Sequence, residues 1–456
     1  MLRTTVEGTT ATTDYVQGTK PGHKTDQIAA DALLLPDIFF GAYQAMASRL
    51  VGAKAGARLN IYVPPTATAA VSVVSVSEDR VRTADALVDV RRFAIELPGP
   101  NGPIGIELWS DPAGRLLRFS VPARAFDIIR SDLAAVTSRR EPIARPNDER
   151  VSIPANGFSL TGTLSQPAGK PAAGVRRAAV VLVSGSAQTD RDEMLAGIPI
   201  FGQLASALAD GGLVVLRYDK RGVGQSGGRS ENTTLGDYAD DAIAAVKFLE
   251  RRPDVDRHRV AVLGYGEGGA VAAVAASREG SIAALVLVAA PGVTGDAFVL
   301  EQQEHLLDLM KVPEAERQAK IDLQKRLHRA VLTGEGLDSL PADLRRGADT
   351  PWYRSFLAFD PATVLRKTKQ PILIVQGGMD REVAPVNADR LAAIARGRGG
   401  KAGAAVEVVK LPALNHLLVP APTGEIDEYD HLASRGIGPG VASAIGPWLE
   451  DTMRAR

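Results

Sequence analysis

The segment Ala261–Gly269 constrains the fold of this chain more than any other, because it places four glycines where a strand meets a helix. The apolar run Val260–Leu263 suits a buried strand, and Gly269–Ala276 has helical spacing. Glycine permits the backbone conformations of a very tight turn and lets a helix approach a strand closely. The sequence therefore predicts a sharp strand-to-helix turn around Gly266. A glycine-rich turn without any chemical role is the alternative.

The hydrophobic pattern changes near residues 139–150, where charged residues and prolines cluster. Before this segment, short runs with a period of two are rich in β-branched and aromatic residues, which predicts antiparallel strands. These runs are Leu59–Val63, Val71–Val76, Phe93–Leu97, Ile104–Trp109 and Leu116–Val121. One helix is predicted over Pro36–Leu50. We expect an accessory, mainly antiparallel β domain over residues 1–140 and a linker over residues 141–150.

After the linker, strands and helices alternate, which is typical of a parallel sheet with crossover connections. Short apolar runs suited to buried strands are Ala178–Val183, Leu213–Leu216, Val260–Leu263, Ala284–Val288, Ile372–Val375 and Val406–Val409. Asp237–Arg251 is the clearest amphipathic helix. The polar helical segment Phe298–Arg346 contains no strand, which predicts a cap at about residues 295–350. Residues 151–456 are therefore expected to form an α/β domain with a mostly parallel, doubly wound sheet and a helical cap insertion.

Charge and composition exclude several classes of function. Lys plus Arg and Asp plus Glu number 53 each, so no net field attracts nucleic acid or an anionic membrane. No apolar run approaches the roughly 18 residues of a membrane span. Met1–Lys20 is polar and lacks the apolar core of a signal peptide, which predicts a soluble chain. The mature part of an exported protein would look the same. The start of the chain, which includes His23, is expected to be mobile. The absence of cysteine excludes disulfides and thiolate metal sites, but it fixes neither the compartment nor the oligomeric state.

Two polar residues follow the last predicted strands. Asp380 ends the segment Gln376–Asp380 after one strand, and His416 ends Leu411–His416 after the last one. A lone aspartate at a strand end is usually a cap, and a lone histidine is usually structural. Their joint position after Gly266 gives the chain order of a nucleophile position, an acid and a base, which favours an acid–base pair.

Taken together, these motifs resemble those of an α/β-hydrolase. From Val151 onward the chain is similar to the serine-aminopeptidase-like and acyl-esterase branch, in its G-S-x-x-x-D-R-D loop, its Y-D-x-R-G-x-G-x-S-G turn and its G-Y-x-E-G-G elbow. The resemblance implies an α/β-hydrolase fold and a Ser/Asp/His hydrolase of small-molecule esters or, less readily, amides, with no cofactor. It maps the acid onto Asp380 and the base onto His416. It also implies a serine at the position where this chain has Gly266.

The resemblance further implies an oxyanion hole. The loop after Ala178–Val183 would donate the backbone N–H of Ser186, and the turn would donate the N–H of Glu267. A strand-to-helix loop without function is an equal alternative for the first of these. Ser184 and Tyr265 are candidate substrate contacts.

The glycine-rich turn Arg217–Gly228 could suggest a phosphate cradle, but no Gly-Lys-Ser/Thr ending follows it. A structural turn braced by Asp219 and Arg221 is the favoured interpretation. Asp190 and Asp192 would bind a metal only with further ligands, and no H-E-x-x-H cluster is present, so no metal site is expected.

Glycine at position 266 removes the hydroxyl that would form an acyl-enzyme. A water molecule could be activated there by His416, oriented by Asp380, against a carbonyl held by the two N–H groups. Oxyanion stabilisation and binding can leave roughly 10³ to 10⁴-fold catalysis when triad members are removed, so weak activity is physically reasonable. A pseudoenzyme that only binds a ligand and a deliberately inactivated variant are the other open interpretations.

Two regions would shape the pocket. Trp352, Tyr353 and Phe356 follow the cap, and either line an apolar acyl site or anchor the cap to the sheet. The excursion Leu417–Pro439, which contains His431, is either a wall of the pocket mouth or a solvated acidic loop.

Overall fold

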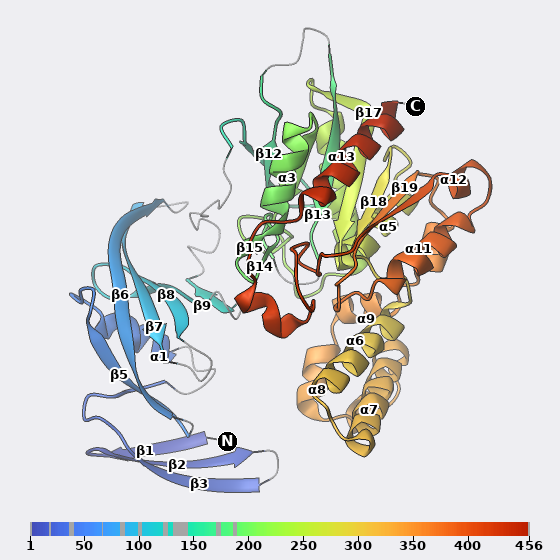
Figure 1. Cartoon of the computed structure of the whole chain (residues 1–456). Helices are drawn as coiled ribbons and strands as arrows, with labels where there is room; N and C mark the ends of the chain where they lie inside the picture. The colour runs from blue at the N-terminus through green and yellow to red at the C-terminus, as the bar shows by residue number, and fades with distance from the viewer. Residues whose placement is uncertain are drawn as a thin grey trace. The chain divides into compact units, whose positions relative to one another are not determined.

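The structure is a computed structural model that describes residues 2–17, 20–35, 41–65, 67–82, 87–98, 103–121, 126–130, 145–169, 175–185 and 189–454. The chain forms two compact units, Met1–Arg139 and Arg140–Arg456 (Figure 1). Each unit contains hydrophobic core clusters built from its own residues.

The first unit begins with a three-stranded antiparallel sheet. It consists of β1 (Leu2–Glu7), β2 (Thr10–Gln17) and β3 (Lys20–Gln27). The prediction of a mobile start is therefore wrong. Threonine is β-branched and favours strands, but polar residues on both faces leave no apolar alternation in the sequence by which to recognise them.

A seven-stranded sheet follows, in the order β10-β9-β8-β7-β6-β5-β4. Its strands are β4 (Leu33–Leu34), β5 (Arg58–Val63), β6 (Ala67–Arg82), β7 (Leu87–Leu97), β8 (Ile104–Ser110), β9 (Leu116–Val121) and β10 (Phe126–Ile129). All neighbours except β4 and β5 pair antiparallel. The prediction of a mainly antiparallel β region is confirmed.

One helix packs on this second sheet. α1 spans Gly41–Arg49, and residues 36–40 of the predicted helix lie outside the described residues. Met46 of α1 is buried in the same core cluster as Leu108 and Phe119 of the sheet. The ring of Tyr43 stacks on that of Phe119, with centroids 4.1 Å apart. Tyr43, the aromatic residue of α1, therefore packs against the core of this unit.

The second unit is built on an eight-stranded sheet in the order β11-β12-β16-β13-β17-β18-β19-β20. Its strands are β11 (Glu149–Pro154), β12 (Ser159–Ser165), β13 (Arg177–Val183), β16 (Val214–Tyr218), β17 (Val255–Tyr265), β18 (Leu285–Val288), β19 (Ile372–Gly377) and β20 (Val406–Leu411). β12 pairs antiparallel with both of its neighbours, β11 and β16. The remaining pairs, from β16 and β13 through to β19 and β20, are parallel. The α/β prediction is confirmed. Because β11 begins at Glu149, the last two residues of the predicted linker are instead strand.

Helices cover both faces of this sheet. Successive side chains of a strand point to opposite faces, and accordingly Val180 packs in one core cluster and Val181 in the other. α3 (Ile200–Asp210) and α13 (Pro439–Arg454) lie side by side over one face (Figure 1). α4 (Leu235–Glu250), α5 (Glu267–Arg278) and α11 (Val386–Arg396) cover the other. α4 begins two residues before the predicted helix because the Thr234 side chain caps it by accepting a hydrogen bond from the Asp237 N–H.

Helices also fill the long segment between β18 and β19. They are α6 (Gly295–Leu309), α7 (Glu314–Thr333), η2 (Leu337–Ser339), α8 (Ala342–Ala348), α9 (Pro351–Leu357) and α10 (Pro361–Leu365). α6, α7, η2, α8 and α9 lie beyond one end of the strands (Figure 1). They share a small core that includes Leu327, Val331 and Leu357. This is the segment for which the sequence predicts a cap.

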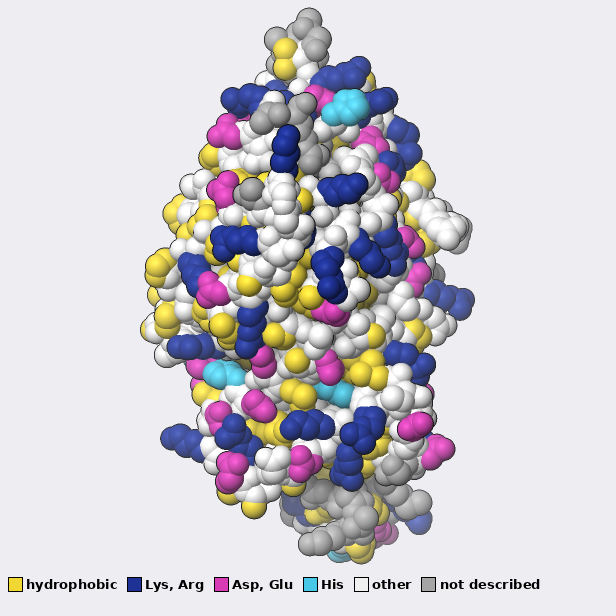
Figure 2. Space-filling model, turned by 90° about the vertical axis from the view of Figure 1, so that its right-hand side faces the viewer, with side chains coloured by type: hydrophobic (Ala, Val, Ile, Leu, Met, Phe, Trp, Pro, Cys, Tyr) yellow, Lys and Arg dark blue, Asp and Glu magenta, His cyan; other side chains and the backbone are white. Residues whose placement is uncertain are grey.

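Shorter elements complete the second unit. They are β14 (Met194–Leu195), β15 (Ile198–Pro199), α12 (Gly400–Ala404) and η3 (Ile426–His431). None of the helices in the described part of the chain has the length and hydropathy that a bilayer span requires. Figure 2 shows acidic and basic side chains interspersed on the face that it draws, in keeping with the balanced composition.

Candidate active site

The turn between β17 and α5 has the sharp geometry that its glycines predict. Gly266 has φ 56° and ψ −124°, and its N–H donates to the Val288 carbonyl at 2.9 Å. A Cβ on Gly264 would lie 2.0 Å from the Gly268 carbonyl oxygen, and a Cβ on Gly268 would lie 2.2 Å from the Val183 oxygen. These two glycines are therefore required for the close approach of α5 to β17 and β13.

Gly266 itself has space around it. An ideal Cβ at this position would lie 3.8 Å from His416 Nε2, 3.9 Å from His416 Cε1 and 3.9 Å from Gly185 Cα. All three are ordinary van der Waals distances. A positive φ costs a residue other than glycine about 1–3 kcal/mol. A serine side chain would thus fit beside the imidazole, at the cost of that backbone strain.

The structure brings the predicted acid and base together next to this position. Asp380 follows β19 and is fully buried, and His416 follows β20. His416 Nδ1 lies 3.0 Å from Asp380 Oδ2. The carboxylate is fixed by two further donors, the Val383 N–H at 2.8 Å and the Gln376 amide at 3.0 Å. With Nδ1 donating to the carboxylate, Nε2 is the nitrogen that lies nearest the Gly266 position.

Two opposing influences act on the charge of His416. Burial lowers the pKa of its imidazole, but the negative charges of Asp380 and Glu382 raise the pKa more, to about 9. The protonated imidazolium is therefore favoured at neutral pH. A base at this position becomes competent as the pH rises toward 9.

Tyr265 holds the base in place. Its hydroxyl donates to the His416 backbone carbonyl at 2.8 Å, and its ring centroid lies 5.0 Å from that of the imidazole. Only 1% of Tyr265 is exposed, and burial raises the pKa of its phenol. These contacts favour a positioning role over the substrate contact that was predicted. Ser184, the other candidate contact, is also buried.

The oxyanion loop is only partly described. Ser186 lies outside the described residues, so its role stays a prediction. The preceding Gly185 donates its N–H to Glu193 Oε2 at 3.1 Å, and the Lys220 ammonium donates to the Gly185 carbonyl. Glu193 Oε2 also accepts the Thr189 hydroxyl at 3.0 Å. The Gly185 N–H is thus already paired with Glu193, and Lys220 holds the carbonyl of the same residue.

Sequence reasoning missed Glu193 and Lys220 as members of this site. Burial raises the pKa of the Glu193 carboxyl to about 7. The available signal was the position of Glu193 directly after the D-R-D motif, but nothing in that spacing indicates where its side chain goes.

Glu267 links the turn to the segment after the cap. It is the first residue of α5, so its N–H has no acceptor within the helix and is placed to bind an anion. Its buried carboxylate accepts the indole N–H of Trp352, at 3.1 and 3.2 Å to its two oxygens. Burial raises the pKa of Glu267.

The three aromatic residues of α9 anchor the cap. Trp352 stacks on Phe356 with centroids 5.9 Å apart, and both pack against the sheet core. Tyr353 packs against the cap core, and its hydroxyl lies 3.1 Å from His328 Nε2 of α7. Of the two predicted roles, anchoring is the one that these contacts favour.

Asp192, one of the two aspartates considered above as metal ligands, and Asp219 of the glycine-rich turn each pair with a buried arginine. Arg191 Nη2 lies 2.7 Å from Asp219 Oδ2, and Arg217 Nε lies 2.8 Å from Asp192 Oδ1. Arg221 pairs with Asp241 of α4 at 2.7 Å. The glycine-rich turn after β16 is therefore braced by Asp219 and Arg221, in the way the sequence indicated.

The excursion after His416 contacts the first cap helix. His305 Nε2 of α6 lies 2.8 Å from Glu425 Oε2, and the Tyr429 hydroxyl donates to Glu382 Oε1 at 2.6 Å. Gln302 of α6 donates to the Glu382 carbonyl at 3.1 Å. This segment thus joins the cap to the loop that carries Asp380.

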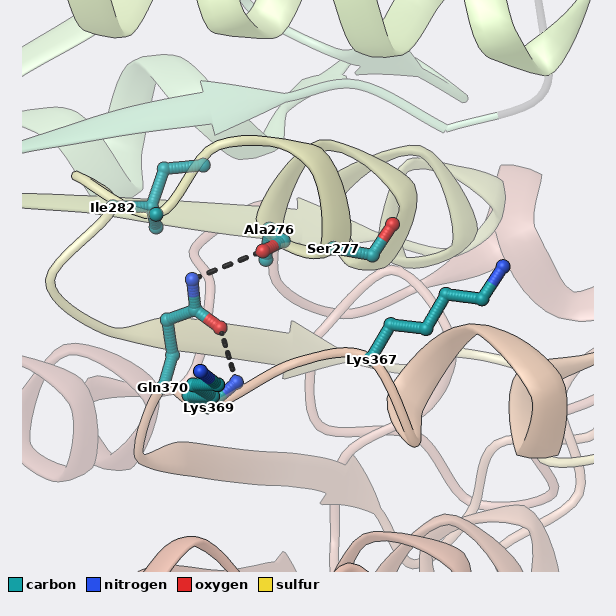
Figure 3. Close-up of a pocket in the computed structure, with 7 residues that line it drawn as sticks. Ala276, Ser277, Ile282, Lys367, Lys369 and Gln370 are labelled. Atoms are coloured by element: carbon teal, nitrogen blue, oxygen red, sulfur yellow. Dashed lines mark hydrogen bonds between the residues drawn. The ribbon is translucent and has the colours of Figure 1, made fainter.

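The cavity drawn in Figure 3 is separate from this site. It is lined by Ala276, Ser277, Gly280, Ile282, Lys367, Lys369 and Gln370. Ile282 and Gln370 precede β18 and β19, whereas Asp380 and His416 follow their strands. The Gln370 amide donates to the Ala276 carbonyl at 3.0 Å (Figure 3). The cavity therefore lies near the amino ends of β18 and β19, whereas Asp380 and His416 lie beyond the carboxyl ends of their strands.

Comparison with known proteins agrees with this architecture. Residues 176–402 match the family model described as serine aminopeptidase, S33. The esterase EstD of Thermotoga maritima is 26% identical over 271 residues, which cover 59% of this chain and 61% of EstD. The chain therefore spans less than two thirds of the length of this curated relative.

Solved structures also resemble the chain. The hypothetical protein PA2218 from Pseudomonas aeruginosa is 18% identical, with a TM-score of 0.45 over 69% of this chain and 98% of that protein. Est1E from Butyrivibrio proteoclasticus, solved with ferulic acid bound, is 18% identical, with a TM-score of 0.42 over 67% of this chain and 99% of that one. From its own sheet topology and the family match, the second unit of this chain has the α/β-hydrolase fold, and residues 176–402 are similar to the family described as serine aminopeptidase, S33.

Proposed function

We propose that the second unit hydrolyses small-molecule carboxylic esters, and amides less readily, with a water molecule in the place of a serine hydroxyl. The observation that carries this proposal is the distance of 3.8 Å between His416 Nε2 and the Cβ position of Gly266, beside a buried Asp380. A pure binding protein has no chemical use for a histidine coupled to a buried carboxylate in this place.

The proposed reaction is a direct hydrolysis. His416 Nε2 takes a proton from water as the water oxygen attacks the ester carbonyl carbon. The Glu267 N–H at the start of α5, together with the N–H of Ser186, would hold the negative charge that develops on the carbonyl oxygen. The tetrahedral intermediate then collapses and breaks its bond to the alkoxide oxygen, which takes the proton from His416 and leaves as the alcohol. No acyl-enzyme forms, because residue 266 has no hydroxyl.

Three proteins test this proposal with p-nitrophenyl esters: the chain as it is, His416→Ala and Gly266→Ser. We expect slow release of p-nitrophenol by the chain as it is, and a loss of about 10²-fold in His416→Ala, the lower range for general-base catalysis. Gly266→Ser should be faster and should show an acyl-enzyme by mass spectrometry. If Gly266→Ser gains nothing and His416→Ala loses nothing, the assignment of the site is wrong.

A second candidate function is ligand binding without turnover, and the glycine at position 266 is the observation that favours it. Saturable binding of esters or carboxylic acids that is unaffected by His416→Ala, with no product released, would support this alternative. The same set of proteins therefore separates the two functions.

A further inference from the structure

We infer that Glu193 and Lys220 are positioning residues of this site: together they hold the two backbone groups of Gly185 and thereby aim the loop that would supply the first oxyanion donor. This inference rests on the proposed function, because that donor acts only in the proposed reaction. Neither side chain has a step of its own in the hydrolysis, so each acts through the backbone of the loop and not on the ester.

Gly185 lies directly beside the position where the reaction would occur. It follows β13 at the carboxyl end of that strand, and its Cα is 3.9 Å from the point where a Cβ on Gly266 would stand. A Cβ on Gly185 itself would lie 3.0 Å from Glu193 Oε1 and 3.4 Å from Tyr265 Cδ1. The Glu193 carboxyl therefore packs directly against the backbone of the loop.

Two side chains hold Gly185 by its backbone. Glu193 Oε2 accepts the Gly185 N–H at 3.1 Å, and the Lys220 ammonium donates to the Gly185 carbonyl. In a trans peptide unit the carbonyl and the N–H that follows it are coplanar and point in opposite directions. The group that binds the Gly185 carbonyl thus also sets the direction of the next N–H along the chain, which is the predicted oxyanion donor.

Glu193 carries two features that do not favour stability. Its backbone has φ 48°, a left-handed conformation that residues other than glycine adopt infrequently. Its Oε1 is buried and has no hydrogen-bond partner among the described residues. Backbone strain and unpaired buried oxygens both destabilise a fold, and they cluster at functional sites, where the surrounding structure imposes them. We therefore attribute both features to the role of Glu193 at Gly185.

Lys220 acts on both arms of the predicted oxyanion hole. It follows β16 and is 4% exposed. Burial raises the pKa of the Glu193 carboxyl, to about 7, and also that of Glu267, while the positive charge of Lys220 lowers the pKa of each. The ammonium is thus coupled to the residue that holds Gly185 and to the residue whose own N–H is the second predicted donor. Removing this charge should affect both arms together.

The experiment compares variants of the full chain in the hydrolysis of p-nitrophenyl butyrate, with kcat and KM measured separately and hydrolysis in buffer subtracted. Glu193→Ala removes the acceptor of the Gly185 N–H, and we expect kcat to fall by about 10²-fold, the lower range for loss of one oxyanion donor, with KM unchanged. Glu193→Gln keeps an accepting oxygen, so its kcat should stay within about threefold of that of the unaltered chain. Circular dichroism melts must show that each variant is folded at the assay temperature.

Lys220→Met removes the donor to the Gly185 carbonyl and should lower kcat to a similar extent. Arg221→Met is the matched control, since Arg221 is the next residue of the same turn and pairs with Asp241 of α4. This control should lower the melting temperature and leave kcat unchanged. If Arg221→Met lowers kcat as much as Lys220→Met does, the turn acts as a whole and the role given to Lys220 is wrong.

One measurement needs no variant. Hydrogen exchange of the unaltered chain, followed by mass spectrometry, should find the Gly185 amide strongly protected, because its hydrogen bond to Glu193 is buried. Glu193→Ala should speed exchange in the segment around Gly185 and leave exchange in β20 as it is. A Gly185 amide that exchanges as fast as an exposed one overturns the inference, even if every variant fails to fold.

The outcomes separate this inference from the proposed function. If p-nitrophenol release depends on His416 while Glu193→Ala matches the unaltered chain in kcat, the positioning role is refuted and the hydrolysis stands. If the unaltered chain releases none, Glu193→Ala and Glu193→Gln are each combined with Gly266→Ser, and the rate of acylation is measured by mass spectrometry. Slower acylation with Glu193→Ala than with Glu193→Gln then supports the positioning role, although hydrolysis by water is refuted. Equal rates, or no acylation at all, refute both proposals.

Discussion

His416 is charged or neutral according to its neighbours, and this decides when it can work as a base. Its burial opposes a positive charge, while Asp380, in contact through Nδ1, and Glu382 favour one. The balance raises the pKa of the imidazole to about 9. Below that pH the ring is mostly protonated and cannot accept a proton from water.

Hydrolysis should therefore increase with pH until the imidazole has lost its proton. We expect kcat/KM for p-nitrophenyl esters, corrected for hydrolysis in buffer alone, to rise about tenfold per pH unit and to level off near pH 9. Asp380→Asn removes the negative charge that favours the imidazolium, so the rise should move to lower pH by about one unit or more. The plateau should be lower as well, because the amide holds Nδ1 less well. A rise at the same pH in both proteins would contradict the role given to Asp380.

At the same scale, the sequence predicted that Asp380 and His416 would lie together, but not which groups hold them. Asp380 and His416 follow strands, so their place could be predicted from spacing. Tyr265 contacts the His416 carbonyl across 151 positions of sequence, and no local pattern indicates such a contact. Lys220 likewise reaches Gly185 across 35 positions of sequence, and Glu193 does so from eight positions further along the loop after β13.

α9 is the element that connects the cap to the turn. Its Tyr353 packs in the cap core, and its Phe356 packs in the sheet core. Trp352 lies between these, stacks on Phe356, and donates its indole N–H to the buried carboxylate of Glu267. α9 therefore links the cap core to Glu267, the residue that follows Gly266.

Replacing Trp352 with phenylalanine keeps an aromatic ring on Phe356 but removes the donor to Glu267. A buried acceptor that loses its partner costs about 1–3 kcal/mol, so the free energy of unfolding in urea should fall by about this amount. Tyr353→Phe is the comparison variant, since it removes a hydroxyl that contacts Gln324 and His328 of α7 and leaves the contact of Trp352 with Glu267 in place. Equal stability of Trp352→Phe and the unaltered chain would show that the contact does not stabilise the fold.

The whole molecule consists of two units, each with its own core. Every strand pairing of the eight-stranded sheet, and both of its core clusters, lie within Arg140–Arg456. Asp380, His416 and the turn at Gly266 belong to the same unit. The first unit has its own sheets and its own helix.

Because a unit with its own core can fold alone, we propose that residues 145–456 form an independent domain. Expressed by itself, this fragment should unfold in one cooperative transition and should keep the rate of ester hydrolysis of the full chain within about twofold, since the fragment contains the entire proposed site. Circular dichroism and the p-nitrophenyl ester assay measure both quantities. An unfolded or aggregated fragment would show that the first unit is needed for the fold.

Local spacing was enough to predict the parallel sheet, the tight turn at Gly266 and the order of Asp380 and His416, because periods of two and 3.6 residues and glycine-rich turns are properties of neighbouring residues. The three-stranded sheet at the start of the chain was missed, because strands that are polar on both faces have no such period. The contact of Trp352 with Glu267 joins residues 85 positions apart, and that of Tyr265 with His416 joins residues still further apart. Such contacts depend on how helices and strands pack in three dimensions, so the distance from His416 to the Gly266 position could be learned only from the folded chain.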